Sequence, residues 1–224
     1  MIQYGTVFTA ITLLFALFAG PPLGAQAQDQ AKVQPPKVEW SKKFGGPGNQ
    51  WGNAVQQTMD GGYIVAGITE RDRKFPWDIC LIKVDAAGNL VWQKTFGGEG
   101  NDIANSVLQA ADGGYIAVGA KARSSVNDDK ELDVYLIKVD AAGTLVWQKT
   151  FGGDDEDIGY SVQPTTDGGY IVAGETKSSG AGEADVFLIK TDAAGTLVWE
   201  KTFGGDDEDI GYSVQPTTDG GYIV

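Results

Sequence analysis

The chain has 224 residues, with 17 Lys and Arg against 30 Asp and Glu, a net charge of −13 and no histidine. The lack of histidine excludes a Ser/His/Asp or Cys/His relay, an imidazole general base and a His-ligated metal. One cysteine, Cys80, excludes a disulfide framework and a CxxC redox or zinc pair. We expect no nucleic-acid partner, because that affinity comes mainly from Lys and Arg. The 32 glycines and 10% aromatic residues indicate a turn-rich β protein.

Residues 1–27 are predicted to be a signal peptide. The apolar run at residues 7–19 is 13 residues long, shorter than the roughly 20 residues that a membrane span needs. Residues 25–27 (AQA) have the small-x-small pattern of a cleavage site, so cleavage is expected before Gln28. Because no Lys or Arg precedes Lys32, an uncleaved anchor or a wrongly assigned start is the alternative.

A repeat of about 52 residues fills the chain after a polar linker at residues 28–39. Each unit begins with W-x-K-x-F-G-G and continues with D-G-G-Y, and the complete units add L-I-K and D-A-A-G. The units are 40–91, 92–146, 147–198 and the partial 199–224, and they begin at Trp40, Trp92, Trp147 and Trp199. The last 26 residues match residues 147–172 at 25 positions, which indicates a recent duplication.

Four strands are predicted in each complete unit. In the third unit they are residues 161–165, 170–174, 185–190 and 197–203. The Asp-Gly and Gly-Gly pairs between the first two supply the positive φ angles of a tight turn. Residues 177–184 have loop composition, and their counterparts at 70–77 and 121–132 differ in length.

This pattern predicts an all-β fold made of β-propeller blades of four antiparallel strands, with three complete repeats and a truncated fourth. A single blade cannot bury both faces, so neighbouring blades must cover them. The recurring Trp is interpreted as a wedge between blades, and a surface platform for sugars is the alternative.

Residues 133–149 (DVYLIKVDAAGTLVWQK) and 167–174 (DGGYIVAG) resemble the blade repeats of the quinoprotein-alcohol-dehydrogenase-like β-propellers. They are more similar to tandem-repeat secreted or surface-attached proteins of prokaryotes, many of them labelled lipoproteins. The resemblance covers residues 40–224 and implies a propeller. The quinoprotein enzymes need about eight blades, a cofactor cavity, calcium ligands and commonly adjacent cysteines. Since this sequence has one cysteine and fewer than four blades, the resemblance implies no catalytic, cofactor-binding or metal-binding residue.

Three and a half units do not make a ring of about four to eight blades. We therefore expect the sequence to be a fragment of a longer repeat protein. The alternative is a four-bladed ring in which residues 38–44, a copy of the outer strand, join the last half-blade and close the circle.

Two acidic runs, residues 154–157 (DDED) and their copy at 206–209, are the candidate calcium ligands. Four consecutive acids do not match a calcium loop, so a solvated acidic loop is the preferred interpretation. Glycoside hydrolysis needs a carboxylate pair about 5–10 Å apart, and the sequence singles out no such pair.

Other polar candidates have structural interpretations. The aspartates of D-G-G-Y and D-A-A-G are expected to form turns. Asp78, Asp133 and Asp185 are expected to have a similar local role at the edge of the strand that each one enters. Cys80 lies where other units have Tyr135 and Phe187, so a buried core thiol is expected. Three lysines that follow the repeated Trp are expected on the strand surface: Lys94, Lys149 and Lys201.

The predicted function is an exported, non-enzymatic propeller for binding, adhesion or display, with an unidentified protein or glycan ligand and no cofactor. The expected location is secreted or at the cell surface, or the periplasm, with no membrane span in the mature chain. The alternative is the propeller part of an extracellular polysaccharide-acting enzyme whose catalytic residues lie elsewhere. Trp51, Phe75 and Trp77, which break the repeat pattern, would then stack on sugars.

Overall fold

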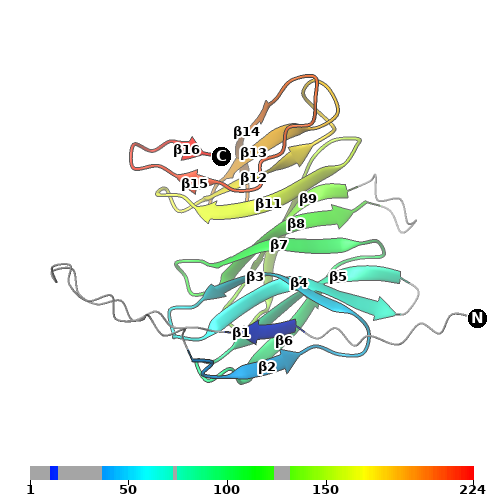
Figure 1. Ribbon diagram of the computed structural model, residues 1–224. Helices are drawn as coiled ribbons and strands as arrows, with labels where there is room; N and C mark the ends of the chain where they lie inside the picture. Colours follow the sequence, from blue (N-terminus) through cyan, green and yellow to red (C-terminus); the bar gives the residue numbers. More distant parts are fainter. Residues whose placement is uncertain (1–10, 15–36, 73–74, 124–131) are drawn as a thin grey trace, which may run out of the picture.

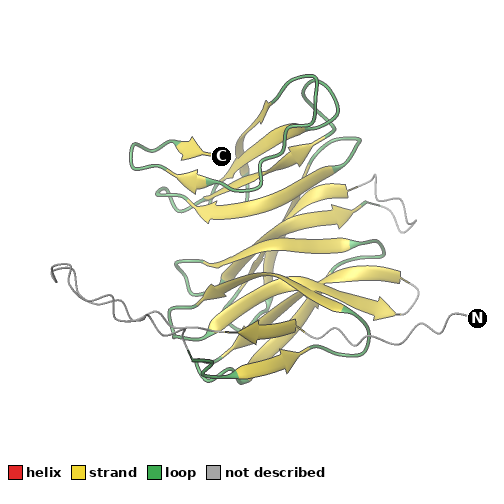
Figure 2. Cartoon of the chain, viewed as in Figure 1, coloured by secondary structure: helices red, strands yellow, loops and turns green. Residues whose placement is uncertain are grey.

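The chain folds as β-structure throughout the part that can be described (Figure 2). The computed structural model describes residues 11–14, 37–72, 75–123 and 132–224, and every regular element in these ranges is a strand. Among these residues no helix is long and apolar enough to cross a membrane. The predicted all-β class is therefore confirmed.

Three blades, each an antiparallel sheet of four strands in chain order, form the body of the fold. Blade one contains β3 (Gln50–Gln57), β4 (Tyr63–Asp72), β5 (Phe75–Val84) and β6 (Leu90–Phe96). Blade two contains β7 (Asp102–Gln109), β8 (Tyr115–Ala122), β9 (Leu132–Val139) and β10 (Leu145–Phe151). Blade three contains β11 (Asp157–Pro164), β12 (Tyr170–Thr176), β13 (Asp185–Thr191) and β14 (Leu197–Phe203). A repeat counted from its Trp thus begins inside the fourth strand of a blade.

The strands of blade three lie close to their predicted positions. Strand β14 has the predicted bounds, and β12 and β13 each run slightly further than expected. Every residue of β12 is buried, because sheets on both sides cover an inner strand of the stack. The first strand, β11, starts at Asp157 rather than at residue 161, so the end of the acidic run belongs to the sheet.

The variable loop of the first unit is much shorter than predicted. We expected residues 70–77 to form a loop, but β4 continues to Asp72 and β5 starts at Phe75. These two residues pair, so the hairpin ladder extends almost to its tip, where aromatic residues favour strand geometry. In the third unit residues 177–184 do form a loop, apart from a bridge at its end. Most of the second-unit loop, residues 124–131, lies outside the described residues.

The blades pack face to face in a stack (Figure 1). The first strand of each following blade contacts the previous blade: β7 contacts β3, β4 and β5, and β11 contacts β7, β8 and β9. Ile64 and Leu81 of blade one share a buried cluster with Ile137 of blade two. The opposite face of blade two, with Leu136, packs on Ile189 of blade three. Alternate side chains of the inner strands therefore enter two different cores.

A bulge in the first strand of a blade adds a polar link to the next blade. The register of β3 shifts at Asn53, whose Nδ2 donates to the carbonyl oxygen of Ala104 at 2.8 Å. The same bulge in β7 lets Asn105 Nδ2 donate to the carbonyl oxygen of Gly159 at 2.9 Å. Bulges re-aim a side chain out of the ladder, and here they direct an amide at the neighbouring backbone.

The repeated Trp packs between blades, as predicted. Trp92 of β6 meets Tyr115 of the next blade at a ring-centroid distance of 5.7 Å, and its Nε1 donates to the carbonyl oxygen of Ala141 at 3.0 Å. The other pairs are Trp40 with Tyr63, Trp147 with Tyr170 and Trp199 with Tyr222, at 5.9, 6.3 and 6.1 Å. Each indole therefore links the fourth strand of one blade, or the segment equivalent to that strand, to the tyrosine strand of the following repeat.

The D-G-G-Y turn holds a buried lysine that the sequence analysis missed. Lys83, the lysine of L-I-K, is 3% exposed, and its Nζ donates to Asp60 Oδ2 at 2.9 Å and to the carbonyl oxygen of Val84 at 2.9 Å. Asp60 also accepts from the Gly62 backbone N–H at 3.0 Å, which confirms its role as a turn former. Lys138 with Asp112 and Lys190 with Asp167 repeat this ion pair at 2.6 and 2.8 Å. A lysine in an otherwise apolar strand was the sequence feature from which this ion pair could have been predicted.

The two ends of the stack do not meet. Strand β2 (Ser41–Phe44) pairs with β1 (Ile11–Leu14), and β15 (Gln215–Pro216) pairs with β16 (Tyr222–Ile223). Figure 1 shows these two small sheets at opposite ends of the stack. The alternative in which residues 38–44 close a four-bladed ring is therefore wrong for this structure. Strand β1 lies within the predicted signal peptide, most of which lies outside the described residues, so that peptide stays a prediction.

We expect Gly195→Ala to destabilise the protein more than Gly168→Ala. Both glycines have a positive φ, +74° and +83°, so alanine strains both turns by about 1–2 kcal/mol. A Cβ at Gly195 would also lie 2.8 Å from the Trp147 ring, whereas one at Gly168 meets nothing within 4 Å. Displacing the indole should add about 1–3 kcal/mol. Urea unfolding of both variants measures this, and equal losses would contradict the wedge role of the indole.

We expect Asp60→Asn to reduce the free energy of unfolding by about 1–3 kcal/mol at neutral pH, because the buried Lys83 ammonium loses its anionic partner. Hydrogen bonds from Thr58 and Lys83 lower the pKa of Asp60 from 3.8 to about 2. The stabilisation is therefore complete above about pH 4 and disappears as the pH falls through 2. Denaturation from pH 2 to 7 should show the wild type and variant converging at low pH. The matched control is Asp219→Asn in the partial fourth repeat, where the described contacts of the carboxylate are local to the turn.

Candidate functional site

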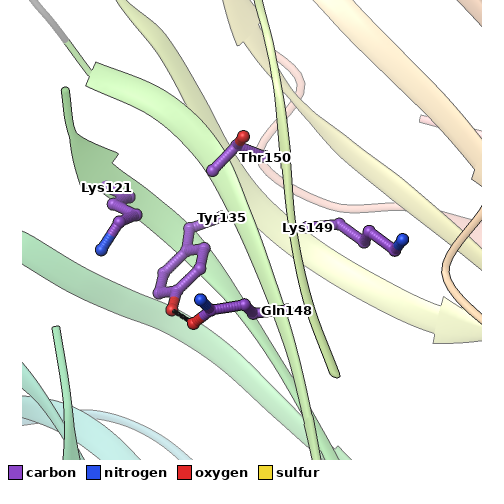
Figure 3. Close-up of a pocket in the computed structure, with 5 residues that line it drawn as sticks. All are labelled: Lys121, Tyr135, Gln148, Lys149 and Thr150. Carbon is purple, nitrogen blue, oxygen red and sulfur yellow. Dashed lines mark hydrogen bonds between the residues drawn. The ribbon is translucent and has the colours of Figure 1, made fainter.

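An open cavity of about 250 Å³ lies on blade two. Its lining comes from three adjacent strands: Lys121 of β8, Tyr135 of β9, and Gln148, Lys149 and Thr150 of β10. In Figure 3 Lys121, Tyr135 and Gln148 gather on one side, while the ammonium group of Lys149 points away from them. The cavity is therefore formed within one sheet and presents one cation beside a phenol and an amide.

Two of the lining residues are specific to blade two. Lys121 lies between paired residues Asp102 and Asp133, and the equivalent positions in blades one and three are Thr69 and Thr176. Tyr135 pairs with a glycine and a threonine, and its equivalents by the same pairing are Cys80 and Phe187. Since the other blades fold with threonine at its position, packing does not require Lys121. Tyr135 is 2% exposed and belongs to the core shared with blade one, so it also serves packing.

The charges at this cavity are partly compensated. Lys121 Nζ lies 4.9 Å from the centroid of the Tyr135 ring and 3.6 Å from Asp102 Oδ1. The Tyr135 hydroxyl forms a hydrogen bond with Gln148 Oε1. Burial, with a smaller effect of the Asp102 charge, raises the pKa of Tyr135 to about 12. The phenol therefore stays neutral at physiological pH, and the group suits hydrogen bonding and charge recognition more than proton transfer.

Buried carboxylates meet at each blade junction. A Cβ on Gly152 would lie 2.3 Å from Asp157 Oδ2 and 2.9 Å from Asp133 Oδ1, so the two side chains face each other across this glycine. A Cβ on Gly97 would likewise meet the carboxylates of Asp78 and Asp102. One on Gly204 would meet those of Asp185 and Asp209. The expected local role of Asp78, Asp133 and Asp185 at the strand edge is thus incomplete, because each one also faces an acid of the next repeat.

These carboxylates are surrounded by hydrogen-bond donors. Asp157 Oδ2 accepts from the Gly153 N–H at 2.8 Å and from Ser178 Oγ at 2.7 Å, and Arg123 Nε lies 3.4 Å from Asp133 Oδ1. Burial raises the pKa of Asp133, the nearby Asp157 adds to this, and Arg123 opposes it. These donors offset part of the cost of burial, yet the pKa of Asp133 is raised overall, so the pair is a structural contact between blades rather than a site for a bound anion.

The acidic run is split between solvent and core. Asp154 and Asp155 are exposed, as a solvated loop predicts. Glu156 instead pairs with Lys177 at 2.7 Å, and Asp157 is fully buried, so the solvated interpretation is wrong for these two residues. In the described part of the chain, no three Cys, Asp or Glu side chains are close enough to hold a metal ion.

Blade three carries a second buried acid that the sequence analysis did not single out. Glu175 is 5% exposed and accepts from the Tyr160 hydroxyl at 3.1 Å, and burial raises its pKa. Tyr160 in turn packs on Tyr212 with ring centroids 5.0 Å apart. By strand pairing, the equivalents of Glu175 are Ile68 and Ala120. This difference between blades was the sequence feature that could have indicated the buried acid.

The remaining candidates agree with their structural interpretations. Cys80 is a buried free thiol, and burial raises its pKa to about 11. Asp140 Oδ1 accepts from the Thr144 N–H at 2.8 Å inside its turn. The three lysines that follow the repeated Trp are exposed on their strands: Lys94, Lys149 and Lys201.

Two of the three suspected sugar-stacking aromatics lie together. Trp51 and Trp77 of blade one are in contact, with ring centroids 4.3 Å apart and an interplanar angle of 67°. Trp51 is 41% exposed. Phe75 opens β5, and its side chain lies outside the described part of the structure.

Known proteins show partial similarity to this chain. No protein-family model matches the chain. Regulatory protein FlaEY of Caulobacter vibrioides is 27% identical over 144 residues, which cover 55% of this chain and 15% of that protein. The structure of Sqt1 from Chaetomium thermophilum matches with a TM-score of 0.37 and 12% identity, over 70% of this chain and 37% of that one. The resemblance to quinoprotein-like repeats stays a prediction.

Proposed function

We propose that this chain is an exported, non-enzymatic β-propeller-repeat protein that binds a ligand through side chains that differ between its blades. The observation that carries the proposal is the cavity of blade two, where Lys121 replaces the threonine that suffices for packing in the other blades. Repeated interactions maintain the scaffold, and departures from the repeat are free to serve recognition.

The chemistry of the cavity favours binding over catalysis. Lys121 is beside an acid and an aromatic ring, and the high pKa of Tyr135 keeps its hydroxyl protonated. The Tyr135 hydroxyl is therefore not poised near neutral pH, where a general acid or base works best. FlaEY, the partial relative, is likewise named for regulation. Export is supported by the short apolar run at residues 7–19 and the small residues at 25–27.

A second candidate function is the propeller part of a polysaccharide-acting enzyme. The contact between Trp51 and Trp77 favours it, because exposed indoles are suited to the apolar faces of sugars. In that case catalysis would depend on residues outside this chain.

We expect the full chain, expressed in a bacterial host, to be recovered outside the cytoplasm with Gln28 as its first residue. Cell fractionation and N-terminal sequencing measure this. The exported protein should then bind members of a glycan and peptide array without cleaving them. Lys121→Thr, which copies both other blades, and Tyr135→Phe, which copies blade three, should each weaken that binding about tenfold. Circular dichroism checks that each variant is folded.

The control is Lys201→Ala, an exposed lysine of blade three, which should leave binding unchanged. Retention of the chain in the cytoplasm with Met1 intact would contradict export. Cleavage of an array component by the purified protein would contradict a non-enzymatic role. Unchanged binding by both cavity variants would contradict a binding role for the cavity.

A further inference from the structure

A pair of tryptophans that does not line the blade-two cavity lies at one end of the sheet of blade one. Trp51 is the second residue of β3, and Trp77 is the third residue of β5, with β4 between them. Trp51 pairs with Ile68 and Trp77 with Glu70, so the two indoles reach across the same end of the sheet. Their T-shaped contact leaves 41% of Trp51 exposed.

The fold does not require tryptophan at either position. By strand pairing, the equivalents of Trp51 are Ile103 in blade two and Ile158 in blade three. The residues that occupy the place of Trp77 before the buried Asp of the third strand are Leu132 and Ala184, which are only 4% and 1% exposed. In the other blades, aliphatic side chains therefore occupy this end of the sheet. A large indole left partly in water forgoes burial that would stabilise the fold, so its presence here calls for a ligand.

Polar groups border the two rings. The Trp77 backbone N–H donates to Asn101 Oδ1 at 3.1 Å, which places the Asn101 side chain beside this strand. On the other side Glu70 Oε2 accepts from the Asn49 N–H at 2.9 Å, and Glu70 lies directly opposite Trp77 in the sheet. An apolar face flanked by oxygen acceptors matches a ligand that has both C–H faces and hydroxyl donors.

We propose that the Trp51–Trp77 pair is a binding platform for an uncharged glycan, with sugar C–H faces on the indoles and hydroxyls toward Glu70. This rests on the proposed binding function and adds a ligand class and a second surface. The net charge of −13 and the Glu70 carboxylate disfavour an anionic polysaccharide. Two rings also present far less area than the roughly 800 Å² per partner of a stable protein interface, so the proposal commits to a glycan rather than a second protein.

The test is calorimetric titration of the full-length protein with β-1,4- and β-1,3-linked glucose hexasaccharides, with a galacturonate hexasaccharide as the anionic comparison. At least one glucose hexasaccharide should bind, with a change in tryptophan fluorescence, and the galacturonate should bind more weakly. Trp51→Ile and Trp77→Leu, which copy the other blades, should each weaken binding about tenfold or more, and the double variant should abolish it. Melting temperatures check that each variant is folded.

The matched control is Lys201→Ala, an exposed lysine of blade three outside both sites, which should leave glucan binding unchanged. The absence of binding to both glucans, or equal binding by the folded double variant, would overturn the proposal. A change of oligomeric state in Trp51→Ile, seen by sedimentation, would also overturn it by assigning the indoles to self-association. If glucan binding fails while the blade-two variants still affect another ligand, the glycan platform falls and the proposed function stands.

Discussion

One contact recurs at every junction of this structure, the packing of an indole from one strand against a tyrosine of the following blade. The four Trp–Tyr centroid distances lie between 5.7 and 6.3 Å. Because a blade exposes an apolar face on both sides, its stability depends on the next sheet covering that face. The indole positions the two sheets, and the D-A-A-G turn must bend closely beneath it. A Cβ at Gly88 would lie 2.7 Å from the ring of Trp40.

The buried lysine completes this arrangement from the other side of the turn. Lys83, Lys138 and Lys190 pass from a core strand to the D-G-G-Y turn and pair there with its aspartate. The second glycine of that turn leaves room for the ammonium group. A Cβ at Gly62 would lie 2.6 Å from Lys83 Nζ. Each letter of D-G-G-Y thus has a physical role: ion pair, positive φ, space for lysine, and contact with the indole.

The local sequence pattern was sufficient to predict the strands of a blade, but not the contacts at the junctions between blades. Strand β14 has its predicted bounds because its turns and apolar alternation are local features. The burial of Asp157 was not predictable in this way, because a carboxylate of the preceding blade and the hydroxyl of Ser178 surround it. The loop expected at residues 70–77 was wrong for a related reason: pairing across the hairpin continues to Asp72 and Phe75.

The repeats also provide an internal reference for function. Residues that recur in each blade hold the stack together, whereas Lys121, Trp51 and Trp77 differ from their equivalents and are not fully buried. The sequence analysis singled out the tryptophans as breaks in the repeat. It missed Lys121, because its partners Asp102 and Tyr135 lie on other strands and meet it only after the sheet has formed.

The central claim, that the indole couples adjacent blades, is tested most directly by a double-mutant cycle. Trp92→Leu and Tyr115→Leu, singly and together, are compared by urea unfolding with a second cycle of Trp92→Leu and Tyr63→Leu, whose tyrosine contacts a different indole. The account predicts a coupling free energy of about 0.5–1.5 kcal/mol for the first pair and additivity for the second. Additive losses in the first cycle would contradict the account.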